Sequence, residues 1–158
     1  MQFISIAPAL VLSICLLTMA SFLCPAIGQP VATLHQSVQL EAFSEGNGPP
    51  IVMLGGGTFG AAAFAAHAKI LAKQFRVVRL QTLNVEKSQK KEQLPVGYSV
   101  KFESAAMART LLSLGITTPA DFVGQSFGAL VALDFALDHP DLARTLALFE
   151  PPVFWAVP

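Results

Sequence analysis

The sequence predicts an α/β protein with three layers, in which a mostly parallel sheet lies between helices. Short, continuously apolar segments of strand length alternate along the chain with segments of helical periodicity. Glycine-rich turns follow two of the strand-like segments. Because these strands lack the polar and apolar alternation of a half-exposed sheet, we expect helices to cover both faces.

The first elements follow the order strand, strand, helix, strand. Residues 38–43 alternate as a strand with one solvated face would, and turn residues occupy 45–50. The next apolar run leads into Gly55-Gly56-Gly57, and an alanine-rich helix follows it. The predicted elements are strands at 38–43, 51–54 and 76–80 and a helix at 61–73.

The middle of the chain contains a polar segment and a second helix. Residues 81–97 are rich in lysine and glutamate around 86–92, and we expect them to form a surface loop. Residues 99–114 have helical periodicity, and Gly115 is placed to end that helix. The predicted core-facing residues are Phe102, Ala106, Met107, Leu111 and Leu114.

The last elements are a strand, a helix and a further strand. A short buried strand is expected at 120–123 and a helix at 129–137, before a turn at His139-Pro140. The final strand, 145–149, would lie uncovered at the edge of the sheet. We therefore expect a fold that is incomplete at its C-terminus.

The motif with the clearest chemical meaning is Gly124-Gln125-Ser126-Phe127-Gly128, which lies between a predicted strand and a predicted helix. This is the sequence form of a nucleophile elbow, a tight turn that presents a serine hydroxyl at the edge of a sheet. The flanking glycines let strand and helix pass close together. Ser126 is the candidate nucleophile.

The N-terminal segment reads as a targeting sequence. No charged residue precedes Glu41, and the apolar run ends near Ala26 and Gly28, which are spaced like the small residues before a cleavage site. We expect residues 1–28 to be a signal peptide, with an uncleaved membrane anchor as the alternative, and residues 29–158 to be a partial catalytic core. The expected location is secreted or periplasmic, and any membrane contact would run through this segment.

Composition narrows the chemistry further. Both cysteines, Cys15 and Cys24, lie in the leader, so the processed protein would offer no disulfide, thiol nucleophile or cysteine metal site. The formal net charge is +0, which gives no electrostatic reason to expect a nucleic-acid partner. We predict a small-molecule substrate and neither cofactor nor metal.

These residues together resemble the α/β-hydrolase superfamily, and esterases and lipases in particular. The resemblance rests on residues 51–57, on 122–129 with the elbow, on His139-Pro140 and on 146–152. It implies that the backbone N–H groups of Gly57 and Phe127 stabilise the oxyanion, with Gly56 as the alternative to Gly57. A tight turn without an oxyanion role would also explain the glycines.

A serine needs a histidine base oriented by a carboxylate, and the family places both after the strand where this sequence stops. Of the histidines, His35 precedes the first strand, His67 lies within the first helix, and His139 lies at the far end of the helix that Ser126 opens. We expect none of them to be the base. Glu150 occupies a position that some members use for the acid, and it could equally cap the neighbouring turn.

Four aspartates do not lie at strand ends that would face the site, and we expect them to be surface or capping residues: Asp121, Asp134, Asp138 and Asp141. The resemblance therefore implies ester-type acyl hydrolysis through Ser126, with base and acid missing from this chain. The alternative is a truncated, inactive hydrolase remnant or a binding module. The reaction type also stays open within the superfamily.

Overall fold

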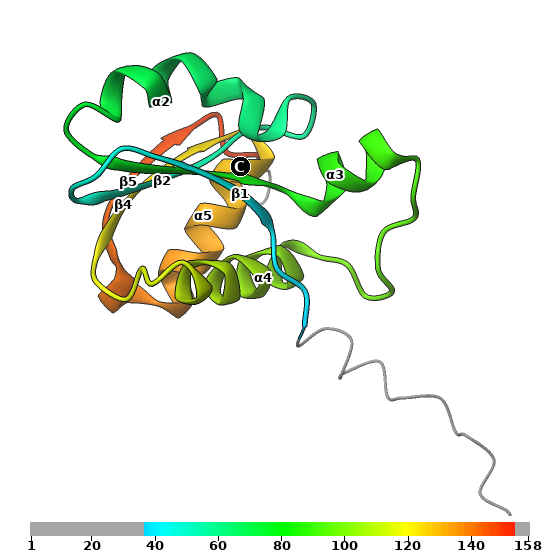
Figure 1. Cartoon of the computed structure of the whole chain (residues 1–158). Coiled ribbons are helices and arrows are strands. Elements are labelled where there is room, and N and C mark those ends of the chain that lie inside the picture. Colours follow the sequence, from blue (N-terminus) through cyan, green and yellow to red (C-terminus); the bar gives the residue numbers. More distant parts are fainter. Residues whose placement is uncertain (1–36, 154–158) are drawn as a thin grey trace, which may run out of the picture. The chain divides into compact units, whose positions relative to one another are not determined.

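The computed structural model describes residues 37–153 and contains one five-stranded sheet in that range (Figure 1). The strand order is β1-β3-β2-β4-β5, in which β1 runs antiparallel to β3 and all other pairs are parallel. This confirms the predicted mostly parallel sheet. The strands are β1 (Glu41–Glu45), β2 (Pro50–Leu54), β3 (Arg76–Gln81), β4 (Ala120–Gln125) and β5 (Ala143–Phe149).

Helices cover both faces of the sheet, as predicted, with α2 on one side and α4 and α5 on the other (Figure 1). Short 3₁₀ helices precede α2 and follow α5. The helical elements are η1 (Gly60–Phe64), α2 (Ala65–Leu71), α3 (Leu83–Lys90), α4 (Val100–Ser113), α5 (Phe127–Asp138) and η2 (Pro140–Leu142).

The core follows the two-residue period of the central strands. Along β2, Val52 and Leu54 pack with α4 and α5, whereas Ile51 and Met53 pack with α2. Since both sets of side chains are buried, β2 reads in the sequence as one continuous apolar run. The larger cluster also contains Phe135, whose ring lies 5.1 Å from that of Phe122.

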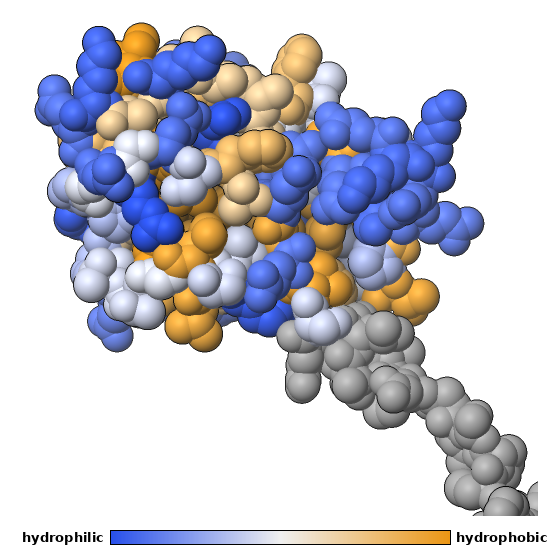
Figure 2. Space-filling view, in the orientation of Figure 1, coloured by the Kyte–Doolittle hydropathy of each residue, from blue (hydrophilic) through white to orange (hydrophobic). Residues whose placement is uncertain are grey.

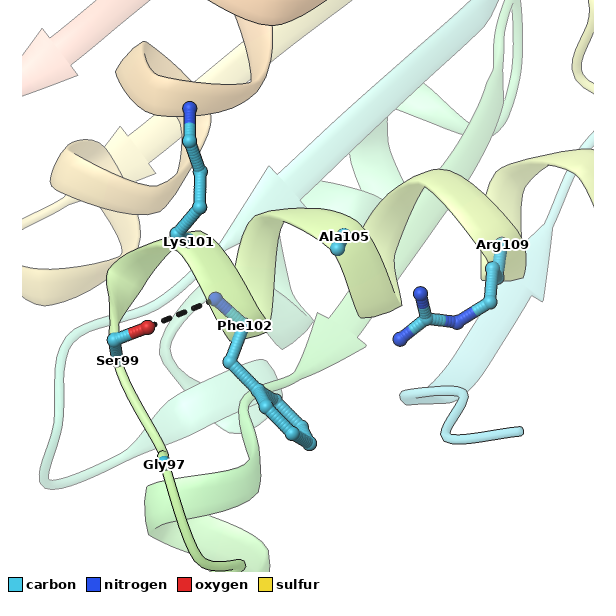
Figure 3. Close-up of a pocket in the computed structure, with 6 residues that line it drawn as sticks. All are labelled: Gly97, Ser99, Lys101, Phe102, Ala105 and Arg109. Carbon is cyan, nitrogen blue, oxygen red and sulfur yellow. Dashed lines mark hydrogen bonds between the residues drawn. The ribbon is translucent and has the colours of Figure 1, made fainter. Parts of the chain in front are cut away.

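Helix α4 begins and ends where its sequence signals predict. Ser99 is its N-cap, and the Ser99 hydroxyl accepts a hydrogen bond from the Phe102 amide at 3.2 Å (Figure 3). Gly115 follows the last turn with φ +71°, a conformation that glycine adopts without strain. Of the predicted core-facing residues, Leu114 is half-buried and the others are buried.

The prediction of a surface loop over 81–97 is wrong in its first part, because helix α3 occupies Leu83–Lys90. Leu83 and Val85 are buried against the core, and this burial stabilises a helix whose other residues are mostly polar. Hydrophilic side chains cover the outer side of α3 (Figure 2), where Lys90 pairs with Glu86 at 2.7 Å. The polar composition of this segment reflects the solvated face of α3, and it gave no sign of the face that is buried.

Two other boundaries differ from the predicted ones. The expected helix at 61–73 is divided into η1 and α2, and the break lies at Phe64, whose φ of −105° and ψ of 9° are not those of an α-helix. The first strand lies at 41–45 and not at 38–43, in antiparallel register with β3.

Within residues 37–153, no helix is long and apolar enough to span a membrane. The predicted leader and the residues before 37 lie outside the described part.

Candidate active site

Ser126 lies at the junction between β4 and α5, in the turn that the motif predicts. Its backbone has φ 51° and ψ −121°, a combination that side-chain-bearing residues rarely adopt outside functional sites. The Ser126 amide donates to the Phe149 carbonyl at 2.8 Å, and its own carbonyl accepts from the Ala129 amide at 3.0 Å. These bonds hold a strained turn in place at the carboxyl edge of the sheet.

The two flanking glycines are required by close backbone approach. A Cβ atom at Gly124 would overlap the backbone of Ala129, and one at Gly128 would overlap the carbonyl groups of Leu54 and Gly55. Any side chain at these positions would push α5 away from the strands. The motif therefore has a steric basis in this fold.

The glycine-rich turn after β2 lies beside the serine. The register pairs Leu54 of β2 with Gly124 of β4, so both strands end at the same level. A Cβ atom at Gly56 would lie 3.3 Å from Ser126 Cβ and 3.9 Å from Ser126 Oγ. Gly57 is the next residue along this turn and is exposed, and its Cα faces the Asn84 side chain. The structure thus brings Ser126 and the triple-glycine turn together.

Phe127 occupies the first position of α5. An amide at this position has no acceptor within its own helix and remains free to donate to another group. Together with the N–H groups of the glycine turn, it gives the surroundings of Ser126 the partial positive charge of a helix start.

Glu150 follows β5 with φ 50° and is exposed. Its side chain lines a hollow of about 400 Å³ that also contains His67 and Gln125, together with Ala63, Phe64 and Phe149. The sequence alone gives no reason to connect His67 with Glu150. The three-residue spacing of Phe64, at the end of η1, and His67, on α2, is the signal that their rings lie on one side, and the rings are 6.0 Å apart.

Neither of the two described histidines, His67 and His139, makes a hydrogen bond with Ser126. His139 ends α5, at the opposite end from Ser126, and its ring lies 4.8 Å from that of Phe135. His67 is exposed on α2, and His35 lies outside the described residues. Within residues 37–153 the Ser126 hydroxyl makes no hydrogen bond with any of these side chains.

The aspartates have ion-pair partners or face solvent. Asp121 accepts from Arg144 and from the Thr145 hydroxyl, and the Arg144 guanidinium lowers the pKa of the Asp121 carboxyl. Asp134 and Asp138 both pair with Lys101, and Asp141 is exposed. Among the described residues, no group of His, Cys, Asp and Glu side chains could hold a metal ion.

A second hollow, of about 260 Å³, lies along α4 (Figure 3). Its two cationic residues extend in different directions (Figure 3). Lys101 extends toward α5, where it contacts Asp138 at 2.6 Å, and Arg109 donates to the Val38 carbonyl at 2.8 Å. Lys101 is thus paired with a carboxylate, whereas Arg109 contacts a backbone carbonyl.

One buried acidic group close to the glycine turn was missed. Glu103 is fully buried on α4, and its Oε1 accepts from the Leu83 amide and the Tyr98 hydroxyl, each at 2.7 Å. Burial raises the pKa of Glu103 and also that of Tyr98. The signal that could have found it is the spacing of Glu103, Met107 and Thr110, which places all three on one face of the helix.

Comparison with known proteins identifies the family. The model of the α/β hydrolase fold family matches residues 49–157. A pimeloyl-[acyl-carrier protein] methyl ester esterase of Chromobacterium violaceum is 35% identical over 103 residues, which cover 65% of this chain and 37% of the relative. An uncharacterized hydrolase of Bacillus subtilis, YraK, is 30% identical over 122 residues, which cover 77% of this chain and 42% of the relative.

Solved structures show the same fold. A thermophilic esterase from Thermogutta terrifontis superposes with a TM-score of 0.60 at 22% identity, over 69% of this chain and 39% of that chain. The chain spans 36% to 42% of the length of the curated relatives it matches. Since the family match covers most of the sequence and the sheet has the expected topology, the chain belongs to the α/β hydrolase fold family.

Proposed function

We propose that Ser126 is the nucleophile of a hydrolase that cleaves ester-type acyl bonds of a small molecule. The observation that carries this proposal is the strained backbone of Ser126, with φ 51°, at the junction of β4 and α5. Backbone strain of this kind persists where function requires it. Relatives named as an esterase and as a hydrolase give further support for the reaction class.

In the proposed reaction, Ser126 Oγ attacks the carbonyl carbon while its proton passes to a base. The carbonyl π electrons move onto oxygen, and the N–H groups of Phe127 and of Gly57, or of the neighbouring Gly56, stabilise that charge. Collapse of the tetrahedral intermediate expels the alcohol, which takes up the proton. Water then releases the acyl group from Ser126 by the same steps.

We propose that the base of this reaction comes from outside the described residues, and that the acid is either Glu150 or a residue outside the described range as well. His139 lies at the far end of α5, and neither His67 nor Glu150 makes a hydrogen bond with Ser126. Glu150 stays a candidate for the acid, because it follows the strand next to the elbow.

A serine-reactive fluorophosphonate tests the proposal on the natural gene product that contains this chain. We expect covalent labelling of Ser126, found by peptide mass spectrometry and abolished in Ser126→Ala. Ser113→Ala is the matched control, because Ser113 is exposed at the end of α4, and it should label normally. Absence of label from the unsubstituted protein would contradict the proposal.

The alternative is a binding module or an inactive remnant, and the lack of a base at Ser126 among residues 37–153 favours it. Ser126-dependent turnover of a short-chain ester by the purified 158-residue chain would rule it out.

We also propose cleavage of the leader after Gly28, with export from the cytoplasm. Sequencing the N-terminus of the protein recovered from cells tests this, and an intact Met1 would contradict it.

A further inference from the structure

The outer side of the triple-glycine turn is contacted by a polar side chain from α3. A Cβ atom built on Gly57 would lie 3.2 Å from Asn84 Nδ2, so the Asn84 carboxamide lies directly over the Gly57 Cα. β3 lies next to β2 in parallel register, and α3 begins two residues after β3 ends. The sheet therefore delivers Asn84 to the edge where the turn after β2 lies.

The two ends of the Asn84 carboxamide lie in different surroundings. Its Oδ1 is buried and has no hydrogen-bond partner among the described residues, whereas Nδ2 is the atom on the Gly57 side. Nδ2 makes no hydrogen bond within residues 37–153 either. The N–H end of the amide dipole is therefore turned toward the turn in which we expect an oxyanion donor.

A buried network holds Asn84 in this place. Glu103 Oε1 accepts from the backbone amides of Leu83 and Asn84, at 2.7 and 3.4 Å, and from the Tyr98 hydroxyl at 2.7 Å. These contacts bind the first residues of α3 to α4, which packs on the core. A carboxylate at the start of a helix also interacts favourably with the helix dipole. The backbone position of Asn84, from which its side chain reaches Gly57, is thus set by contacts with α4.

We propose that Asn84 is a positioning residue for the oxyanion turn: its carboxamide braces Gly57 from outside and directs an N–H dipole toward the place where negative charge develops. This inference rests on the proposed function and adds to it a group that the Gly-x-Ser-x-Gly motif does not contain. Asn84 acts through Gly57 and through its electric field. It need not touch the substrate.

The test measures the rate of fluorophosphonate labelling of Ser126 in the natural gene product, separated into kinact and KI. Removing the brace in Asn84→Ala should lower kinact by about tenfold, because small displacements of a donor weaken charge stabilisation steeply. Asn84→Asp preserves the shape but places negative charge beside the oxyanion, and kinact should fall by roughly 100-fold. KI should not change in either variant.

Ser88→Ala is the matched control, since Ser88 is an exposed residue of the same helix and should label at the unsubstituted rate. Far-UV circular dichroism checks folding, and if Asn84→Ala unfolds, the isosteric Asn84→Asp decides. Labelling of Asn84→Asp at the unsubstituted rate would overturn this inference alone, as would a change confined to KI. No labelling of the unsubstituted protein would overturn the proposed function together with it.

Discussion

The two glycine-rich turns at the carboxyl edge of the sheet are held by different kinds of contact. The elbow at Ser126 is fixed by backbone hydrogen bonds to Phe149 and Ala129 and by the direct approach of Gly128 to the end of β2. The turn at Gly55–Gly57 is closed by the Gly60 amide donating to the Gly56 carbonyl at 3.0 Å. Beyond that bond it depends on side chains from other elements.

Those side chains come from β3 and from the start of α3. Gln81 accepts the amide of Ala61 just after the turn, and Asn84 lies against Gly57. The backbone at Ser126, the proposed nucleophile, is therefore held mainly by backbone contacts, whereas Gly57 lies against a side chain from a helix that a buried polar network holds in place. This difference predicts that substitutions in the two turns have effects of very different size.

The largest effect is expected in the elbow. Gly128→Ala places a methyl group against the Leu54 and Gly55 carbonyls, which belong to the backbone and cannot rotate away, and the free energy of unfolding should fall by about 3 kcal/mol. Gly115→Ala is the control, because its Cβ would meet nothing within 4 Å and only the positive φ is unfavourable, so the loss should be about 1 kcal/mol. Urea denaturation measures both, and equal losses would contradict the backbone argument.

A smaller effect is expected in the network that supports the other turn. Glu103→Leu leaves the Leu83 amide and the Tyr98 hydroxyl without their acceptor, and should lower the free energy of unfolding by about 2 kcal/mol. Glu103→Gln preserves an acceptor oxygen and should retain most of this stability. If both variants unfold at the same urea concentration, the hydrogen bonds of Glu103 contribute nothing measurable.

The difference in stability between the wild type and Glu103→Gln should also depend on pH. Burial raises the folded-state pKa of Glu103 above the ordinary glutamate value of 4.5, so the folded protein binds this proton more tightly than the unfolded chain does. The stability from this group is complete below 4.5 and is lost as the pH rises through the raised value. Relative to Glu103→Gln, the wild type should therefore lose stability as the pH rises above 4.5, and a gain in stability there would contradict the assignment.

The smallest effect is expected at Gly57. In Gly57→Ala the new methyl group would meet the end of the Asn84 side chain at 3.2 Å, and a side chain can move aside, so the loss of stability should stay below about 1 kcal/mol. Combining this substitution with Asn84→Ala should recover most of the loss in thermal melts. Additive losses would show that the two residues do not interact.

The same contrast explains which features could be predicted from the sequence. The elbow was predictable because Gly124, Ser126 and Gly128 carry its geometry within five residues. The resemblance to the family rested on this motif together with residues 51–57, 139–140 and 146–152, and the parallel sheet was predicted from the apolar runs. The role of α3 was not predictable from composition, because its lysines and glutamates outnumber Leu83 and Val85, whose burial determines its position.

The surroundings of the site were harder to predict because they are made by residues distant in sequence. Glu103 contacts Leu83 across 20 positions, and His67 shares a hollow with Glu150. A single sequence gives the periodicity that places each of these on a helix face. It does not show which element packs opposite that face.

The hydrogen bond between Ser126 and Phe149 connects the turn at Ser126 to β5, which lies at one edge of the described sheet. Leu146 and Phe149 of this strand are exposed, and the strand has one neighbour, β4, within the described range. Fraying of β5 would release the amide of the serine and relax the turn. Any segment that pairs with the free edge of β5 would therefore stabilise the backbone conformation of Ser126 without contacting it.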